Sequence, residues 1–140
     1  MKRGDGFTFI EVMNVVAVVV IVAAIVVPGL LNAKKVRNET EATAWCKSLS
    51  TVIEQYHTRF HSYAGGLAQL RAEGYVDDFL GSGKKAGYNF RYSAAANAWT
   101  LTASPVTKGL TGDKFFFVDQ SAVIRFSSTG PATPTSTPVE

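Results

Sequence analysis

The chain has 140 residues, with 14 basic and 11 acidic side chains and a formal net charge of +3. This length allows one modest domain and a membrane segment rather than two domains. Hydrophobic residues make up 46% of the chain and concentrate in one N-terminal run, which leaves roughly a hundred residues for one soluble core. The nearly balanced charge excludes a polyelectrolyte. The single cysteine, Cys46, excludes an intrachain disulfide.

The first predicted element is an uncharged apolar helix from Val12 to Leu31. At about 1.5 Å per residue, its length matches the hydrocarbon core of a bilayer. Pro28 removes a backbone donor and Gly29 follows it, so we predict a kink there. Glu11 stands immediately before the run, where membrane insertion of a carboxylate costs about 2.5–3.5 kcal/mol. We therefore expect Glu11 to have a partner.

The order of residues before this helix is distinctive. Lys2 and Arg3 precede Gly6, and then come Phe7, Glu11 and the apolar run. The sequence GFTFIEV resembles the leader junction, or class III signal peptide, of type IV pilins and pseudopilins. This resemblance implies that a prepilin peptidase cuts between Gly6 and Phe7 and methylates the new amine of Phe7.

Cleavage at this junction gives Glu11 a partner. The new α-amine of Phe7 has an ordinary pKa of about 7.7–8, so it is mostly protonated at neutral pH. If neighbouring helices are offset along their axes, Glu11 of one subunit meets the Phe7 amine of the previous one, which favours polymerisation in one register. The alternative is a glutamate that reaches back to interfacial water. Asp5 and Asn14 depart from the usual family pattern.

After Leu31 the pattern becomes that of an amphipathic helix, which Gly65 and Gly66 end. Apolar residues spaced three and four apart predict one buried face. The residues of this face predicted to pack on a sheet are Trp45, Leu49, Val52, Tyr56 and Phe60.

Four strands are predicted in the rest of the chain, at residues 88–92, 99–103, 115–118 and 123–126. The first two alternate, with aromatic residues and leucine on one face and Asn89, Arg91, Thr100 and Thr102 on the other. The alternation of the three phenylalanines at 115–117 leads us to expect Phe116 to point away from the helix.

The predicted fold class is α+β: a long N-terminal helix, membrane-spanning in its first half and amphipathic in its second, packed against a four-stranded antiparallel sheet, as the resemblance to type IV pilins also implies. We divide the chain into a leader (1–6), a transmembrane and assembly helix (7–31), a globular head (32–126) and a Ser/Thr/Pro-rich tail (127–140). Composition predicts that the tail is disordered. Its hydroxyl groups could alternatively carry O-linked sugars.

Candidate chemistry elsewhere is sparse. Glu54, His57 and His61 share one arc of the helix, but this spacing is a weak metal signal. The acidic side chains that could hold calcium are Asp77, Asp78, Asp113 and Asp119, and they form no tight D-x-D-x-D cluster. The sequence has no G-x-S-x-G motif, and Cys46 beside Trp45 is expected to be packed rather than reactive. We predict no catalytic residue, no metal and no cofactor.

The resemblance implies a structural subunit of a type IV pilus, or fimbrium, acting in adhesion, twitching motility and, as a further role, DNA uptake. Its partners would be further copies of itself, the prepilin peptidase and methyltransferase, an inner-membrane assembly platform and membrane lipid. The precursor would reside in the inner membrane and the mature chain in an extracellular filament on the bacterial surface.

Three alternatives remain. One is a type II secretion pseudopilin, and another is a monomer tethered by an uncut anchor. The third is a binding module displayed on such a filament, for which nucleic acid is an open partner. Its candidate basic residues are Lys84, Lys85, Arg91, Lys108 and Lys114.

Overall fold

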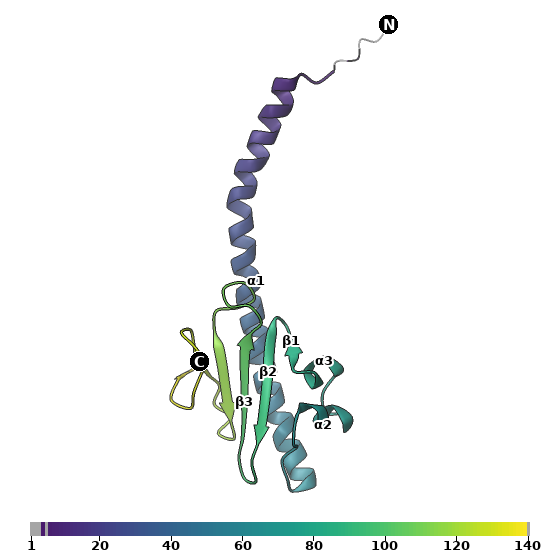
Figure 1. Cartoon of the computed structure of the whole chain (residues 1–140), viewed down its shortest axis with the longest axis vertical. Helices are drawn as coiled ribbons and strands as arrows, with labels where there is room; N and C mark the ends of the chain where they lie inside the picture. Colours follow the sequence, from purple (N-terminus) through teal and green to yellow (C-terminus); the bar gives the residue numbers. More distant parts are fainter. Residues whose placement is uncertain (1–3, 5, 140) are drawn as a thin grey trace. The chain divides into compact units, whose positions relative to one another are not determined.

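A computed structural model describes residue 4 and residues 6–139; the predicted leader residues 1–3 and 5 lie outside the described residues, as does Glu140. The chain divides into two compact units, Met1–Ala33 and Lys34–Glu140. The helix α1 (Phe9–Phe60) contributes residues to both units (Figure 1). The division falls two residues after the predicted end of the membrane helix at Leu31.

The part of α1 in the first unit is apolar and uncovered. Every side chain from residue 9 to residue 33 is exposed. An 18-residue stretch of the helix has a mean hydropathy of 2.9 and no buried residue, so the helix is long and apolar enough to cross a membrane. The helix continues through Pro28 and Gly29. The kink at these two residues remains a prediction.

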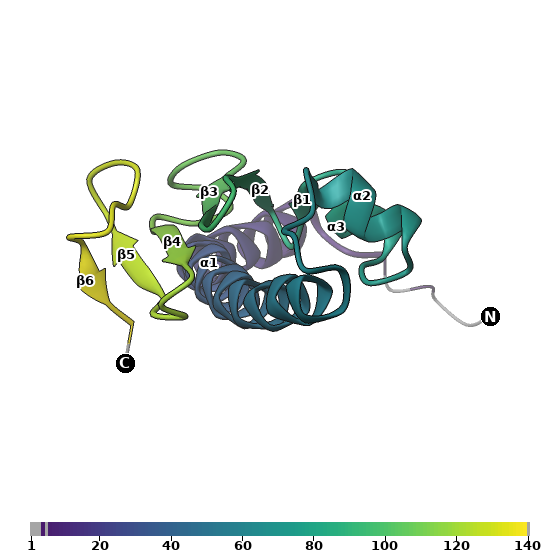
Figure 2. The ribbon, with the colours of Figure 1, turned by 90° about the horizontal axis from the view of Figure 1, so that it is seen from below.

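The second unit is an antiparallel sheet with one face on α1, and two short helices beside β1 (Figure 2). The short helices are α2 (Leu67–Ala72) and α3 (Asp78–Gly81). The strands are β1 (Lys84–Lys85), β2 (Tyr88–Ala94), β3 (Trp99–Pro105), β4 (Phe115–Asp119), β5 (Arg125–Ser127) and β6 (Thr137–Pro138). They lie in the order of the sequence, each paired with the next.

The sheet therefore has six strands in the described residues, and the prediction of four was wrong in number. The two extra strands, β1 and β6, lie at the edges and contain two residues each. A two-residue strand shows no alternation of apolar and polar side chains, so backbone pairing alone defines it. Lys84–Lys85 and Pro138 also suit exposed edges, because lysine and proline discourage further strand pairing.

The predicted alternation of β2 and β3 is confirmed. Tyr88 and Phe90 of β2 and Trp99, Leu101 and Ala103 of β3 are buried in the core. Residues between them on each strand are more exposed. The buried residues of α1 recur at spacings of three and four, as a helix face on a sheet requires: Asn38, Ala42, Cys46, Leu49, Ser50, Ile53 and Tyr56.

The predicted helix face is only partly the observed one. Leu49 and Tyr56 are buried, and Trp45 and Val52 are half-buried against the core. Phe60 is 39% exposed, so its assignment to the core was wrong. It is the last residue of α1 and contacts Tyr56, with 4.4 Å between ring centroids, outside the buried cluster.

The side chain of Phe116 also differs from its expected orientation. It is 2% exposed and belongs to the core, facing α1 rather than pointing away. The register explains the difference, because Phe116 pairs with Ala103 and Val118 pairs with Leu101, both on the helix-facing side of β3. Directly paired residues share a face of the sheet.

The C-terminal tail was expected to be disordered, and the structure instead pairs part of it, β6, with the sheet. Strand β6 pairs with β5, and the Val139 backbone N–H donates to the Ile124 carbonyl at 2.7 Å. The Arg125 guanidinium donates to the Ser136 carbonyl at 3.0 Å, and Ala132 is buried. The tail contributes only backbone groups and the small Ala132 side chain to these contacts. A Ser/Thr/Pro-rich composition does not reveal contacts of this kind.

Candidate processing and assembly site

The predicted cleavage bond lies just before α1. Gly6 and Phe7 are not helical, and both are exposed, Phe7 to 85%. A peptidase binds its substrate in an extended conformation, which a residue inside a helix cannot adopt without local unfolding. The Gly6–Phe7 bond is therefore placed where a protease could reach it.

Glu11 has a partner in its own chain, Thr8. The Thr8 backbone N–H donates to Glu11 Oε2 at 2.7 Å, and the Thr8 hydroxyl donates to the same oxygen at 2.8 Å. In return the Glu11 backbone N–H donates to Thr8 Oγ1 at 3.3 Å. Since α1 begins at Phe9, this is a capping box, with Thr8 as the N-cap and Glu11 as the third helical residue. The capping box satisfies two backbone donors at the start of the helix.

The second carboxylate oxygen of Glu11, Oε1, has no hydrogen-bond partner in the described part of the chain. A carboxylate accepts bonds at both oxygens, so Glu11 can cap its own helix and still bind a cation. The negative charge at the helix N-terminus is also favourable for the helix dipole. Oε1 of Glu11 is thus available to accept a hydrogen bond from a further donor.

A second polar group lies in the head, where α1 contacts the loop between β3 and β4. Asn38 is buried and donates through Nδ2 to the Thr111 carbonyl at 2.8 Å. The Asp113 backbone N–H donates to Glu39 Oε1 at 2.9 Å, and Lys35 pairs with the Asp113 carboxylate at 3.0 Å. We call these five residues the helix–loop clamp. It fixes the loop to the first two turns of α1 in the head.

Gly112 makes the close approach of this loop possible. A Cβ at Gly112 would collide with the Tyr88 hydroxyl oxygen, so any side chain would displace Tyr88. The Tyr88 hydroxyl donates to the Lys114 carbonyl at 2.9 Å. Burial raises the Tyr88 pKa above its ordinary value, and the nearby Glu39 and Asp113 carboxylates raise it further.

The candidate metal residues on α1 have other contacts. Glu54 Oε1 accepts from the Trp99 indole N–H at 2.7 Å and from the Tyr63 hydroxyl at 3.4 Å. His57 stacks on the Tyr63 ring, with 4.2 Å between centroids. Within residues 4 and 6–139, no three His, Cys, Asp or Glu side chains come together as metal ligands would.

The other candidate residues are also engaged locally. Asp77 caps α3 through the Leu80 N–H at 2.8 Å and pairs with Lys85, and these hydrogen bonds, that of Lys85 foremost, lower the Asp77 pKa. Burial raises the pKa of the Cys46 thiol from its ordinary 9.0 to about 12, which keeps it protonated and unreactive at neutral pH.

The five basic candidates for nucleic acid do not form one patch of free charges. Lys85 pairs with Asp77 and lies 4.0 Å from the Trp45 ring centroid, and Lys114 pairs with Glu39 at 3.5 Å. Lys108, in the loop between β3 and β4, lies over the Phe115 ring.

Sequence reasoning missed several residues of these sites, Thr8 above all. The T-x-x-E pattern before an apolar run is a readable capping signal. Asn38 gave no signal, and Glu54 was considered only as a candidate metal residue, because their partners Thr111 and Trp99 are 73 and 45 residues away in sequence.

A long apolar helix with an exposed Gly-Phe junction and a capped glutamate, continuing into a helix packed on an antiparallel sheet, defines a pilin-like subunit. No family model matches the sequence. The chain is 31% identical over 130 residues to the type IV wide pilus major component PilA4 of Thermus thermophilus, covering 88% of this chain and 93% of that protein. The chain belongs to the type IV pilin family, whose members are structural subunits of pili. The pseudopilin alternative is not favoured, because this relative is a pilus major component.

Proposed function

We propose that this chain is a structural, non-enzymatic subunit of a type IV pilus, and a major one. The similarity along 93% of a pilus major component carries this proposal. The structure supports it through residues 9–33, none of which is buried within the chain. Such an apolar helix requires lipid or other apolar helices around it, and copies of the same helix in a filament provide them.

The proposal includes a precursor stored in the inner membrane and a mature chain in an extracellular filament. A prepilin peptidase cuts between Gly6 and Phe7 and methylates the Phe7 amine, and an assembly platform draws the subunit from the lipid. The exposed, non-helical junction supports cleavage at this bond. Adhesion and twitching motility are the proposed roles of the filament, and binding of nucleic acid is left open.

Assembly depends on Glu11 in this proposal. The Phe7 amine of one subunit pairs with Glu11 Oε1 in the next, an oxygen that accepts no hydrogen bond from residue 4 or residues 6–139, while Oε2 keeps the capping bonds to Thr8. Pairing neutralises both charges in the apolar interior of the filament. The capping box holds the carboxylate in one orientation before assembly, so little side-chain entropy is lost when the subunits meet.

Two substitutions at Glu11 separate charge from capping. Glu11→Gln keeps an amide oxygen for Thr8 but removes the charge, whereas Glu11→Leu removes both. An apolar side chain inserts into the membrane more readily than a carboxylate by about 3 kcal/mol, so Glu11→Leu should still be made, inserted and cut. We expect both variants to lose fibres in electron micrographs of cells that carry no other copy.

The readouts are fibres labelled by antibody against the head, and mass spectrometry of the purified protein. The unmodified chain should begin at N-methylated Phe7. A different mature N-terminus would reject the cleavage site. Wild-type numbers of fibres from Glu11→Gln would reject the pairing, and absence of fibres from the unmodified chain would reject the pilus function.

A further inference from the structure

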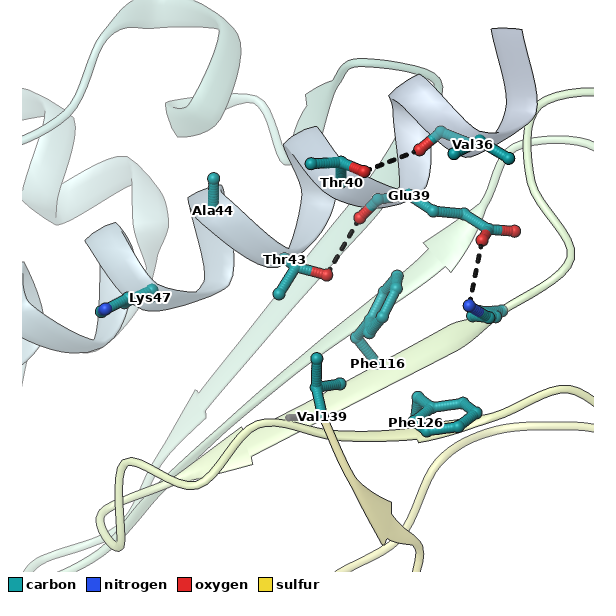
Figure 3. Close-up of a pocket in the computed structure, with 10 residues that line it drawn as sticks. Val36, Glu39, Thr40, Thr43, Ala44, Lys47, Phe116, Phe126 and Val139 are labelled. Carbon is teal, nitrogen blue, oxygen red and sulfur yellow. Dashed lines mark hydrogen bonds and ion pairs between the residues drawn. The ribbon is translucent and has the colours of Figure 1, made fainter. Parts of the chain in front are cut away.

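A groove runs along the head between α1 and the last three strands. It has a volume of about 520 Å³, which is within the range of about 300–1,000 Å³ typical of binding pockets. Phe116 of β4, Phe126 of β5 and Val139, which follows β6, line the side of the groove that faces α1 (Figure 3). On α1 the groove is lined by Val36, Ala44 and Lys47 among others.

The floor of the groove is apolar and incompletely covered. Phe126 and Val139 are half-buried, and Val36 at one end of the groove is 62% exposed. The charged groups at that end are mostly engaged, since Glu39 pairs with Lys114 at 3.5 Å and accepts from the Asp113 N–H. Lys47 at the other end forms no ion pair with any described residue. The groove is thus apolar inside and positive at one end.

The opposite edge of the head carries a complementary feature. Phe79, in α3, is 69% exposed, more than any other aromatic side chain of the head. It follows Asp78, whose side chain is 93% exposed and only 4.0 Å from Arg71, at the limit of an ion pair. α3 lies beside β1, whereas the groove lies beside β5 and β6, at the other end of the strand order (Figure 2).

We propose that the groove binds α3 of a second copy of this chain, with Phe79 on the apolar floor and Asp78 beside Lys47. This inference rests on the proposed pilus function. The groove of one copy then meets a different surface, α3, of the next copy, which makes the contact heterologous. A heterologous contact that does not close into a ring builds an open helical filament. The contact would join heads, separately from the pairing of Glu11 with Phe7.

The chemistry selects this occupant over a small ligand or an unrelated protein. The apolar floor and Lys47 favour an apolar side chain next to a negative charge, and Asp78-Phe79 supplies both in consecutive residues. Opposite charges at the rim orient two surfaces, and an aromatic anchor in a pocket supplies most of the affinity. In a filament each copy presents both halves of the contact at high local concentration.

Disulfide cross-linking tests the contact in sheared filaments. The double variant Phe79→Cys, Ala44→Cys places one thiol in α3 and one in the groove. Mild oxidation should give a ladder of oligomers on a non-reducing gel, which each single variant should lack. The native Cys46 is buried and unreactive, so it does not compete.

Side-chain substitutions give an independent test with a matched control. Phe79→Ser should lower filament yield by about tenfold, as loss of a buried aromatic anchor predicts. Leu110→Ser, at a comparably exposed apolar residue outside the groove, should leave it unchanged. Asp78→Lys and Lys47→Glu should each lower the yield, and the double exchange should restore it.

The outcomes separate this inference from the pilus function. Fibres at wild-type yield from Phe79→Ser, without a ladder from the double-cysteine variant, would overturn the docking and leave the pilus subunit intact. Absence of fibres from the unmodified chain would overturn the pilus function and the docking together.

Discussion

Residues 9–33 and 34–60 of α1 form one helix, yet its two halves are stabilised in different ways. In the first half every side chain is exposed, and in the second half a face from Asn38 to Tyr56 is buried against the sheet. Burial of apolar side chains is the main favourable term in folding. The second half therefore obtains its stability within the chain, whereas the first requires lipid or other subunits.

This difference suits a subunit that leaves a membrane for a filament. A helix that buries nothing in its own chain can exchange one apolar environment for another without unfolding the head. The helix–loop clamp begins at Lys35, just after the division between the two units, and holds the second half of the helix on the head. Changes in the two halves should consequently have separate effects.

The largest effect on stability is expected from a charge placed on the buried face of the second half of α1. Leu49→Asp would bury an unpaired carboxylate at a position that is 1% exposed, and should destabilise the head by more than about 4 kcal/mol. Denaturant unfolding of the detergent-solubilised chain, followed by tryptophan fluorescence, would measure this. Trp99 is a suitable probe because it is fully buried and bonded to Glu54.

Thr51→Asp is the matched control for this prediction. Thr51 lies on the exposed side of the same helix, two residues away, so the change should alter stability by no more than about 0.5 kcal/mol. Equal unfolding midpoints for Leu49→Asp and Thr51→Asp would contradict the assignment of this helix face to the core.

The second expected effect is a loss of head stability at alkaline pH. Burial raises the pKa of Cys46 from 9.0 to about 12 and that of Tyr92 from 10.0 to about 12. Because the folded state holds these protons more tightly, the stabilisation is complete below about pH 9 and is lost as the pH rises towards 12. The same unfolding measurement at several pH values should show stability falling from about pH 9 upward.

Cys46→Ala isolates the thiol in this experiment. The variant should be less stable at neutral pH because it loses buried volume, but its stability should change less between about pH 8 and 9.5, where the thiol of the unfolded chain loses its proton before most of the tyrosines do. A slope equal to that of the unmodified chain would show that Cys46 is not the titrating group.

The sequence predicts the fold where side chains repeat regularly. The alternation in β2 and β3 and the spacing of Leu49 and Tyr56 report burial directly. The apolar run predicts a long apolar helix, and the rest of the chain leaves that helix uncovered. Strands β1 and β6 could not be predicted, because two residues held by backbone bonds carry no pattern. The orientation of Phe116 depends on its pairing with Ala103, a register that its own segment does not encode.

The candidate site divides in the same way. Gly6, Phe7 and Glu11 are adjacent in sequence, so a motif locates them. The helix–loop clamp and the groove join residues of α1 to residues far along the chain, and only the fold brings them together. Thr8 is an intermediate case. Its capping pattern is readable in the sequence, but the charge of Glu11 alone predicts a partner outside the chain and not the local hydrogen bonds.

The smallest expected effect belongs to Thr8, and it tests the first half of the helix alone. Thr8→Ala removes a hydroxyl that both donates to and accepts from Glu11, and loss of an N-cap costs about 1 kcal/mol. Thr8→Ser keeps the hydroxyl and should preserve the cap. Hydrogen exchange of the backbone amides at residues 9–12 in detergent should accelerate about fivefold in Thr8→Ala. Unfolding of the head should not change in either variant, because residues 9–33 bury nothing against it. If Thr8→Ala lowered the unfolding midpoint of the head, the two halves of α1 would be energetically coupled, and the separation proposed between them would have to be abandoned.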